Sequence, residues 1–398
     1  MLTNAELLPA LSTALSDLQQ HPCPIIPSTS NVPKRASVAL IIRVQPHPSH
    51  LPSTSPSPPD NIGGFFAQEW VVHGTVEMLF IKRAARQGDR WTSHVAFPGG
   101  KRDPADAGDI EAAVRETLEE VGLDLEKEAI IPCGHLPDRV VTTSWGTVPL
   151  MVLCPYVFIL TSPAPPTLHL QPTEVASAHW VPILLLTDPA FRTVERCDVS
   201  DRLARRGGPL LRHALRLSLG RMEFAAIRLW PSSSVFSAFG KDFLDGGRDL
   251  VCWGLTLGIL EDLLDMLPPI GDALDLWKWP TFTAPDVRFV VGMMTSGLKR
   301  RNREVAKSLS MGAAMLARQN VEGSVVDLAA SGTEDGEVIG ESTVLVRPSE
   351  VGERTSSVHV LLEGYFGVVR KAVWLTLSGR AVVGTAVAGA LVMRWMRK

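Results

Sequence analysis

The sequence has little excess of charge of either sign and no pattern of paired cysteines. Its 398 residues include 39 Lys or Arg and 42 Asp or Glu, which gives a formal net charge of −3 at pH 7. A basic excess is the usual mark of nucleic-acid binding, so we expect no nucleic-acid partner. The five cysteines are dispersed and contain no Cys-x-x-Cys spacing. This absence argues against a disulfide scaffold or a zinc ribbon and predicts an intracellular, reducing compartment.

The N-terminal segment before Lys34 also lacks the features of a targeting segment. No Lys or Arg occurs before Lys34, whereas a transit peptide is rich in arginine. Leucines at helical spacing instead predict a helix and a linker within residues 1–33. Residues 34–267 contain several short apolar runs and are predicted as one α/β domain, with a Pro/Ser-rich insertion at 45–60. Residues 268–371 are predicted as a low-complexity, mostly disordered linker with short helices.

The end of the chain is apolar. Residues 372–393 contain a single charge, Arg380, and basic residues flank the segment on both sides. As a helix it would be ~33 Å long, about the hydrocarbon thickness of a bilayer. We therefore predict a transmembrane helix that anchors the chain to an organelle membrane, of the mitochondrion, the peroxisome or the endoplasmic reticulum. The uninterrupted apolar run after Arg380 is short for a span, so a buried or surface helix is the alternative.

Three closely spaced carboxylates are the feature that predicts chemistry. Glu116, Glu119 and Glu120 stand at positions i, i+3 and i+4, which lie on one face of an α-helix. Carboxylates at this spacing repel one another, and a divalent cation offsets the repulsion. Hard oxygen ligands select Mg²⁺ or Mn²⁺ over Zn²⁺. The cluster therefore predicts a metal site that can support cleavage of a pyrophosphate by an activated water.

Glycines flank the carboxylates on both sides. The run Phe97-Pro98-Gly99-Gly100 precedes them, and paired glycines let a backbone approach closely and leave its amides free for a ligand. Gly122 follows them and is predicted to end the helix in a left-handed conformation. A strand, a glycine loop, a carboxylate helix and a glycine stop thus form one unit.

This unit resembles the signature of the Nudix hydrolases, whose second half reads Arg-Glu-apolar-x-Glu-Glu-x-Gly-apolar. The run from Arg115 to Leu123 matches it, with Thr117 at the first apolar position. In the first half, Asp106 stands where the signature has Glu, with one more residue before Arg115. That variant is similar to the coenzyme A diphosphatase branch, whose pattern begins Phe-Pro-Gly-Gly-x-x-Asp-x-x-Asp. Ser93 stands where this branch has a glycine.

The resemblance implies a Nudix fold, an α/β/α sandwich around a mixed sheet, and roles for individual residues. Metal ligands would be Glu116, Glu119, Glu120 and the main-chain oxygen of Gly100. Arg115 would orient the carboxylates, and Glu119 and Glu174 would take part in catalysis, Glu174 as general base. Substrate would contact Arg83, Phe97 and Gly99.

The resemblance also implies an activity. The predicted function is metal-dependent hydrolysis of a small nucleoside diphosphate derivative, with coenzyme A or an acyl-CoA as the first choice. Hydrolysis of ADP-sugars, dinucleotides or NAD(H) is the enzymatic alternative. A catalytically inactive, membrane-tethered binding module is the other alternative. The sequence makes no prediction of the oligomeric state.

Overall fold

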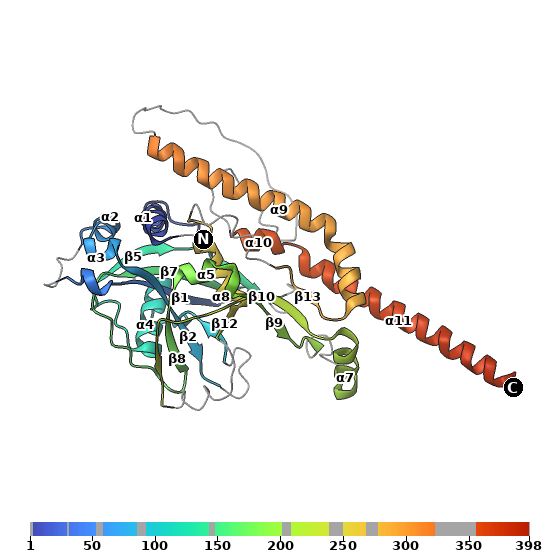
Figure 1. Cartoon of the computed structure of the whole chain (residues 1–398). Helices are drawn as coiled ribbons and strands as arrows, with labels where there is room; N and C mark the ends of the chain where they lie inside the picture. Colours follow the sequence, from blue (N-terminus) through green and yellow to red (C-terminus); the bar gives the residue numbers. More distant parts are fainter. Residues whose placement is uncertain are drawn as a thin grey trace.

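A computed structural model of the chain describes residues 3–29, 32–52, 59–85, 93–142, 148–200, 208–238, 250–267, 278–322 and 356–397. A twisted sheet forms the centre of the body, and two long helices, α9 and α11, lie along one end of it (Figure 1). The helices are α1 (Asn4–Gln20), α2 (Ile62–Phe66), α3 (Glu69–Val72), α4 (Asp109–Val121), α5 (Ile183–Thr187), α7 (Gly208–Leu219), α8 (Gly254–Leu264), α9 (Pro285–Glu322), α10 (Ser357–Leu362) and α11 (Tyr365–Met396). Two 3-10 turns are η1 (Pro48–His50) and η3 (Pro189–Phe191).

The central sheet is mixed, as predicted. Its strand order is β11-β8-β2-β1-β7-β5, with β3, β4 and β6 added at the sides. The central strand β1 runs parallel to β7, and all other described pairs in this sheet are antiparallel. The strands are β1 (Arg35–Gln45), β2 (Thr75–Arg83), β3 (Val95–Ala96), β4 (Gly99–Lys101), β5 (Ile130–His135), β6 (Arg139–Thr142), β7 (Pro149–Leu160), β8 (Val175–Pro182) and β11 (Ser233–Phe236).

Helices cover both faces of this sheet and make the predicted α/β/α sandwich. Successive side chains of a strand point to opposite faces, so the apolar run of β1 supplies two cores. Ala39 and Ile41 pack with residues of α4, whereas Leu40 and Ile42 pack with residues of α1 and α8. The predicted N-terminal helix is present as α1, and its leucines are buried against the second of these faces.

A second, smaller sheet extends the body toward α9. It contains β9 (Arg192–Cys197), β10 (Met222–Arg228), β12 (Val251–Trp253) and β13 (Thr281–Phe282). Phe282 pairs with Met222 of β10 and is fully buried. The chain beyond residue 267 therefore returns to the folded body.

This return corrects the predicted linker with short helices at 268–371. Among the described residues of that range, α9 alone contains 38 residues. Its early residues Val287 and Val291 are buried in a core with Phe282 and with Tyr365 of α11. Sequence reasoning missed this core because its members are far apart in the chain and sparse in each segment. The predicted disorder falls largely on residues 323–355, which lie outside the described residues, as do 53–58 of the Pro/Ser-rich insertion.

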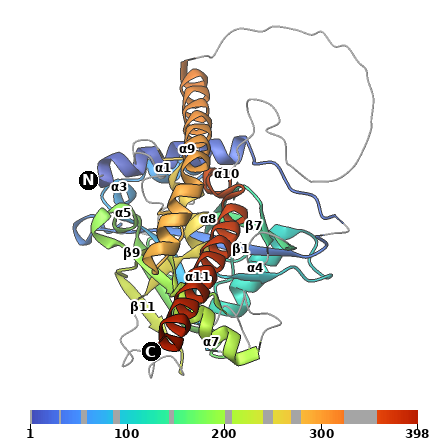
Figure 2. The ribbon, with the colours of Figure 1, turned by 90° about the vertical axis from the view of Figure 1, so that its right-hand side faces the viewer.

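The predicted C-terminal helix is present as α11, but it begins earlier and has two parts. In the first part, Tyr365, Val369, Ala372 and Val373 are fully buried against α9 and the second sheet. Figures 1 and 2 show α9 and α11 side by side over this part. From residue 381 to 397 every residue is exposed, and the helix projects from the body. Within the described chain, α11 belongs to the one helical segment that is long and apolar enough to cross a membrane.

The two parts of α11 should respond differently to truncation. A chain ending at Arg380 keeps the buried part, and we expect it to fold and to lose only the exposed apolar part. A chain ending at Val369 also removes Ala372 and Val373 from the core. Burial of a valine contributes about 1.5–3 kcal/mol, so the shorter chain should be less stable by roughly that amount. Urea unfolding of the two truncated chains measures the difference, and equal midpoints would show that residues 370–380 stabilise nothing.

Candidate active site

The helix α4 positions the predicted carboxylates. Asp109 and Glu111 lie in its first turn, where negative charge is favourable at the positive end of the helix dipole. Gly122 ends the helix with a φ of 70°, and its N–H donates to Leu118 O at 2.9 Å. This confirms the predicted left-handed glycine stop. Thr117 fits the apolar position of the motif because its buried hydroxyl donates to Ala113 O at 2.7 Å.

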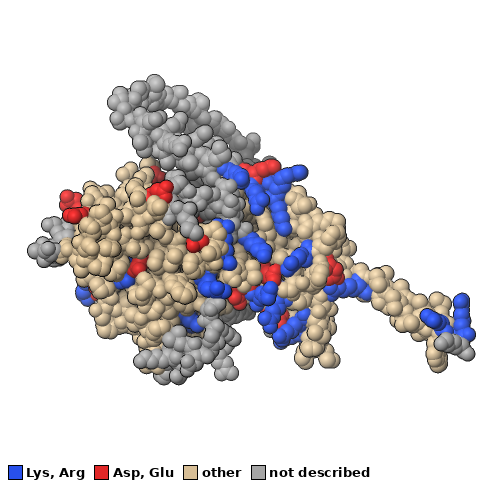
Figure 3. Space-filling model, viewed as in Figure 1, with Lys and Arg blue, Asp and Glu red and all other residues tan. Residues whose placement is uncertain are grey.

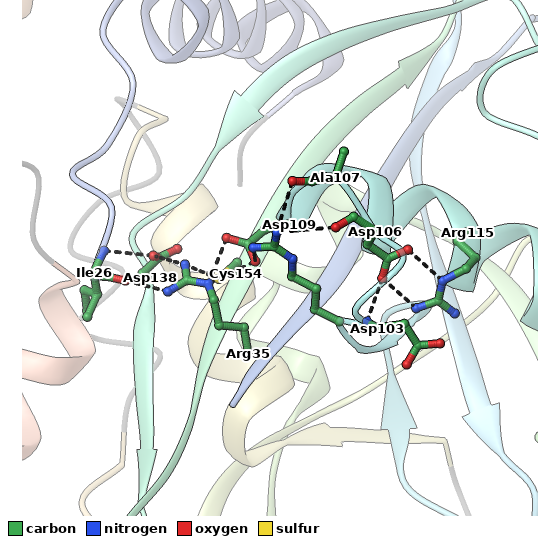
Figure 4. Close-up of polar contacts among 10 residues, drawn as sticks. Ile26, Arg35, Asp103, Asp106, Ala107, Asp109, Arg115, Asp138 and Cys154 are labelled. Carbon is green, nitrogen blue, oxygen red and sulfur yellow. Dashed lines mark hydrogen bonds and ion pairs between the residues drawn. The ribbon is translucent and has the colours of Figure 1, made fainter. Parts of the chain in front are cut away.

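A buried arginine fastens the beginning of α4 to the sheet. Arg35, the first residue of β1, donates through Nε to both carboxylate oxygens of Asp109 at 2.9 Å. Its Nη2 also reaches Asp138 at 3.2 Å, and its Nη1 donates to Ile26 O at 2.6 Å (Figure 4). Each buried charge is therefore paired, as burial requires. Sequence reasoning missed this network because it joins residues separated by about a hundred positions.

The glycine loop lies against α4. Gly99 and Gly100 form β4 and pair with Val38 and Ser37 of β1. Gly99 has a φ of 149°, and a Cβ there would lie 2.2 Å from Ser37 O. A Cβ on Gly100 would lie 2.4 Å from the carboxylate of Glu116. Position 99 therefore requires glycine because of its backbone, whereas a side chain at position 100 would displace the Glu116 carboxylate.

Glu120 is the most deeply buried of the three carboxylates. Its side chain accepts the Gly99 N–H at Oε2, at 2.9 Å, and lies 3.7 Å from Arg83 Nη1 at Oε1. Burial nevertheless raises the pKa of Glu120 to about 7, because the hydrogen bond and Arg83 offset only part of the lost hydration. The nearby charges of Glu116 and Glu174 raise the pKa further. The ionised form of Glu120 therefore needs more positive charge than the described residues supply.

Arg115 joins the other two carboxylates. Its Nη1 donates to Glu116 Oε1 at 3.0 Å and to Glu119 Oε2 at 3.1 Å. On its other side it makes a two-pronged contact with Asp106, at 2.9 and 3.1 Å (Figure 4). This contact lowers the pKa of Asp106. Asp106, which stands where the family signature has Glu, thus holds Arg115 in place, and Arg115 contacts both Glu116 and Glu119.

Two of the predicted metal ligands, Glu116 and Glu120, meet beside the glycine loop, and Arg115 links Glu119 to Glu116. Among the described residues, no group of three or more His, Cys, Asp or Glu side chains is close enough to hold a metal ion. The side chain of Glu116 is mostly buried and that of Glu119 is 56% exposed, so the cluster runs from the protein interior to its surface. Burial raises the pKa of Glu116 as well, and the charges of Glu119 and Glu174 add to this effect. Burial and mutual repulsion make the negative charges of these carboxylates unfavourable. A set of oxygen donors of this kind suits a hard divalent cation, which would offset that cost.

The segment that carries Glu174 is fastened to the end of α4. Gln171 N donates to Glu120 O at 3.0 Å, and His169 N donates to Val121 O at 2.8 Å. At the other end of the segment, Ala84 N donates to Glu174 O at 2.7 Å. The negative charge of Glu174 raises the pKa of both Glu116 and Glu120, so its carboxylate lies within electrostatic reach of the cluster. The segment that carries the predicted loop glutamate thus packs against the end of α4.

One predicted substrate contact is wrong. The ring of Phe97 is 2% exposed and stacks on Phe80 of β2, with ring centroids 5.0 Å apart. Phe97 is therefore a core residue under the glycine loop rather than a substrate contact. The other two predicted contacts, Arg83 and Gly99, both touch Glu120 and lie at the site. A large aromatic residue in a motif signals packing as readily as recognition, which explains the error.

Ser93 retains the backbone conformation of a glycine. Its φ is 59°, and among the described residues it is the one non-glycine with a positive φ. The left-handed region costs an L-residue about 1–2 kcal/mol. Just beyond Ser93, Arg83 N donates to His94 O at 3.0 Å, which fixes the end of β2 next to the site.

We expect Ser93→Gly to stabilise the fold. Relief of the left-handed strain should outweigh the greater entropy of glycine in the unfolded chain, for a net gain of about 0.5–1 kcal/mol. Ser93→Ala, which keeps the Cβ, is the matched control and should give no gain. Chemical denaturation of the three proteins measures the effect. A Ser93→Gly protein no more stable than the alanine variant would show that the conformation is not strained.

The fold and the site together define a class of enzyme. An α/β/α sandwich presents three carboxylates from one helix beside a glycine turn, which suits hydrolysis of phosphate anhydrides with a divalent cation. Among models of protein families, the one that describes the NUDIX domain matches residues 70–196. The chain belongs to the Nudix family and is a Nudix-type diphosphatase that acts on pyrophosphate bonds.

Three relatives extend this comparison. An uncharacterized protein of Schizosaccharomyces pombe is 36% identical over 301 residues, which cover 74% of this chain and 84% of the relative. The mitochondrial coenzyme A diphosphatase NUDT8 of Mus musculus is 43% identical over 60 residues, 15% of this chain and 29% of that enzyme. The peroxisomal coenzyme A diphosphatase NUDT7 of Mus musculus is 40% identical over 63 residues, 16% of this chain and 25% of that enzyme. The chain thus spans less than a third of either mouse enzyme.

Proposed function

We propose that this protein hydrolyses the pyrophosphate bond of coenzyme A or an acyl-CoA, with Mg²⁺ or Mn²⁺ as the cation. Glu116, Glu119, Glu120 and the main-chain oxygen of Gly100 would hold the metal. The observation that carries the proposal is the meeting of the Glu116 and Glu120 carboxylates at the Gly99–Gly100 turn. The Phe-Pro-Gly-Gly run and the two short matches to coenzyme A diphosphatases support this choice of substrate.

Individual residues of the site would have different roles in the hydrolysis. When bound, the cation neutralises the diphosphate and activates a water. Arg115 keeps Glu116 and Glu119 in a fixed orientation, because its guanidinium contacts both of them on one side and Asp106 on the other. Arg83 adds positive charge next to Glu120. We assign to Glu174 the removal of a proton from the water, since its charge acts on both buried carboxylates.

A panel of substrates tests the proposal. Coenzyme A, acetyl-CoA, ADP-ribose, a diadenosine polyphosphate and NADH are each incubated with the enzyme and Mg²⁺ or Mn²⁺, and products are separated by chromatography. We expect the CoA compounds to be cleaved with the highest kcat/KM, and activity to vanish with EDTA and return with metal. Preference for ADP-ribose, the dinucleotide or NADH would overturn the CoA assignment. Cleavage of none of the panel would favour an inactive binding module.

Glu174→Gln separates a general base from a loop residue. Glutamine keeps the shape of the side chain but cannot accept the proton, so we expect the single-turnover rate to fall by about 10²–10⁴-fold. Metal affinity should stay near the wild-type value, because the variant leaves the three α4 carboxylates intact. Calorimetric titration with Mg²⁺, run beside the rate measurement, checks both. A rate equal to the wild type would remove Glu174 from the chemistry.

We also propose that the exposed part of α11 anchors the enzyme to an organelle membrane. Valine, leucine, methionine and tryptophan side chains are exposed along this part, where water would solvate them poorly. The mouse relatives carry organelle names, mitochondrial and peroxisomal, which supports an organelle but favours neither. Full-length protein expressed in cells should resist carbonate extraction. Recovery in the soluble fraction would overturn the anchor.

A further inference from the structure

The helix α7 carries an apolar stripe on the surface of the protein. Leu210, Ala214 and Leu217 stand at positions i, i+4 and i+7, on one face of the helix. Leu210 is 86% exposed and Leu217 is 74% exposed. Two other leucines of α7, Leu215 and Leu219, are buried and fasten the helix to the body. The exposed stripe is therefore additional to the face that the fold uses.

This stripe lies where α11 leaves the body. Arg380, at the boundary between the two parts of α11, donates through Nη1 to Ser218 O in the last turn of α7, at 2.5 Å. Its Nε donates to Asp286 in the first turn of α9, at 2.7 Å. Figures 1 and 2 both show α7 beside the projecting helix. The end of α7 and the root of the projecting helix are thus joined by a direct hydrogen bond.

The projecting part of α11 is too short to hold the body away from a bilayer. From residue 381 to 396 it measures ~24 Å at the rise of an α-helix, against a hydrocarbon thickness of ~30 Å. The helix is continuous from Tyr365 to Met396, and its first part is packed, so no flexible tether separates the body from the projecting part. If the projecting part lies in a bilayer, Arg380 lies at the surface of that bilayer, and so does α7.

The charge around this point suits a membrane surface. Lys and Arg side chains gather over the root of α11 in Figure 3. On α7, Arg212 and Arg216 are exposed on a side of the helix different from that of the leucine stripe, and Arg216 also pairs with Asp198 at 3.3 Å. Arg221 follows α7 and is also exposed. An amphipathic helix with leucines on one side and arginines on another is the form that lies in the headgroup region of anionic membranes.

We propose that α7 is a second membrane contact of this enzyme. It lies in the headgroup region with Leu210, Ala214 and Leu217 toward the acyl chains and with Arg212 and Arg216 toward anionic headgroups. This inference rests on the proposed anchoring by α11. Two contacts joined at Arg380 fix the orientation of the body on the membrane, whereas one helix alone would leave it free to rotate about the helix axis.

A fluorescent probe on α7 tests the proposal in the full chain. Leu217→Cys is made in a Cys197→Ser background, because the other four cysteines are buried. It is labelled with an environment-sensitive fluorophore and reconstituted in vesicles of phosphatidylcholine with about one third phosphatidylserine. Some vesicles also carry a nitroxide near the top of the acyl chain. We expect a blue-shifted emission that the nitroxide quenches by about half or more, because such helices sit ~5–10 Å into the headgroup boundary.

Two positions serve as controls. Arg212→Cys labels another side of the same helix and should be quenched less than the Leu217→Cys label. Leu51→Cys labels an exposed residue next to η1, whose His50 stacks on His73 after α3, away from α7, and should not be quenched. Vesicles of phosphatidylcholine alone should give a smaller blue shift at position 217, because they offer no charge to the arginines.

Each outcome decides the question. Protein that floats with the vesicles but whose Leu217→Cys label emits like the Leu51→Cys label overturns the α7 contact and leaves the anchor standing. A blue shift without nitroxide quenching also overturns it, since another protein or a second copy then covers the stripe. Protein that does not float overturns the anchor and this inference together. Hydrolase activity measured in detergent does not depend on membrane contact, so it tests the proposed enzymatic function separately from these three outcomes.

Discussion

Replacing Glu120 by glutamine is expected to lower the rate of pyrophosphate hydrolysis by about 10²-fold or more while the chain stays folded. The amide oxygen of glutamine can still accept the Gly99 N–H, so the contact between α4 and the glycine loop survives. The variant removes the negative charge that faces the cation, and with it several kcal/mol of interaction in the transition state. The single-turnover rate and the Mg²⁺ affinity, measured side by side, check this result.

The stability of the wild type relative to Glu120→Gln has a pH dependence of defined sign. Burial raises the pKa of Glu120 from 4.5 to about 7, so the folded metal-free protein binds a proton that the unfolded chain has released. Wild-type stability in EDTA therefore falls as pH rises from about 4.5 to about 7, by up to ~3 kcal/mol. Glu120→Gln has no such charge, so its advantage over the wild type should grow across this range.

Glu119→Gln is the matched control, because the Glu119 side chain is 56% exposed, whereas that of Glu120 is buried. It should lose activity to a similar extent, without the gain in stability that Glu120→Gln shows in EDTA. If both variants bind Mg²⁺ and turn over at wild-type values, the metal-centre interpretation is wrong. The binding-module alternative would then describe this chain better.

Gly100→Ala is expected to abolish most activity without unfolding the protein. The added Cβ would lie within 2.4–2.5 Å of the carboxylate atoms of Glu116, which are the far end of a flexible side chain and can move away. Stability should change by less than ~1 kcal/mol, because no backbone atom is displaced. The displaced carboxylate can no longer serve the cation, so the rate should fall by about 10²-fold, with a matching loss of Mg²⁺ affinity.

Two comparisons isolate the cause. In a Glu116→Gln background, Gly100→Ala should add little further loss, because both changes act through the same carboxylate. Gly99→Ala should instead prevent proper folding, since its Cβ would meet the backbone oxygen of Ser37 at 2.2 Å and its φ is 149°. A Gly100→Ala enzyme with wild-type activity would show that the Glu116 carboxylate has no fixed place in catalysis.

The sequence predicted what depends on local spacing. The interval between Glu116 and Glu120 places them on one helix face, and the stop at Gly122 follows from the conformational freedom of glycine, so both could be read without a structure. The short apolar runs after residue 34 likewise predicted an α/β domain, and β1 is one of them. The same reasoning found Glu174 only through its resemblance to a family, because nothing local marks that residue.

The features that were missed depend on distant partners. Arg35 and Asp109 are ordinary charged residues in the sequence, and only the fold brings them within 2.9 Å. Phe97 was taken for a substrate contact because the sequence does not show that Phe80 lies beneath it. Val287 and Val291 looked like part of a linker because they join a core with residues far away in the sequence, such as Met222 and Tyr365. Hydrophobic patterning in a single segment cannot reveal such a shared core.

The position of β1 has a consequence for how the site is made. The glycine loop pairs with the beginning of β1, and the same stretch of β1 runs parallel to β7, with Arg35 opposite Val152. A parallel pair between segments so far apart must close a long loop before it gains any contact, which makes such pairing slow. We therefore expect the stretch of β1 beside Gly99 and Gly100 to take its final position late in folding, and the site around Glu116 and Glu120 to be completed with it.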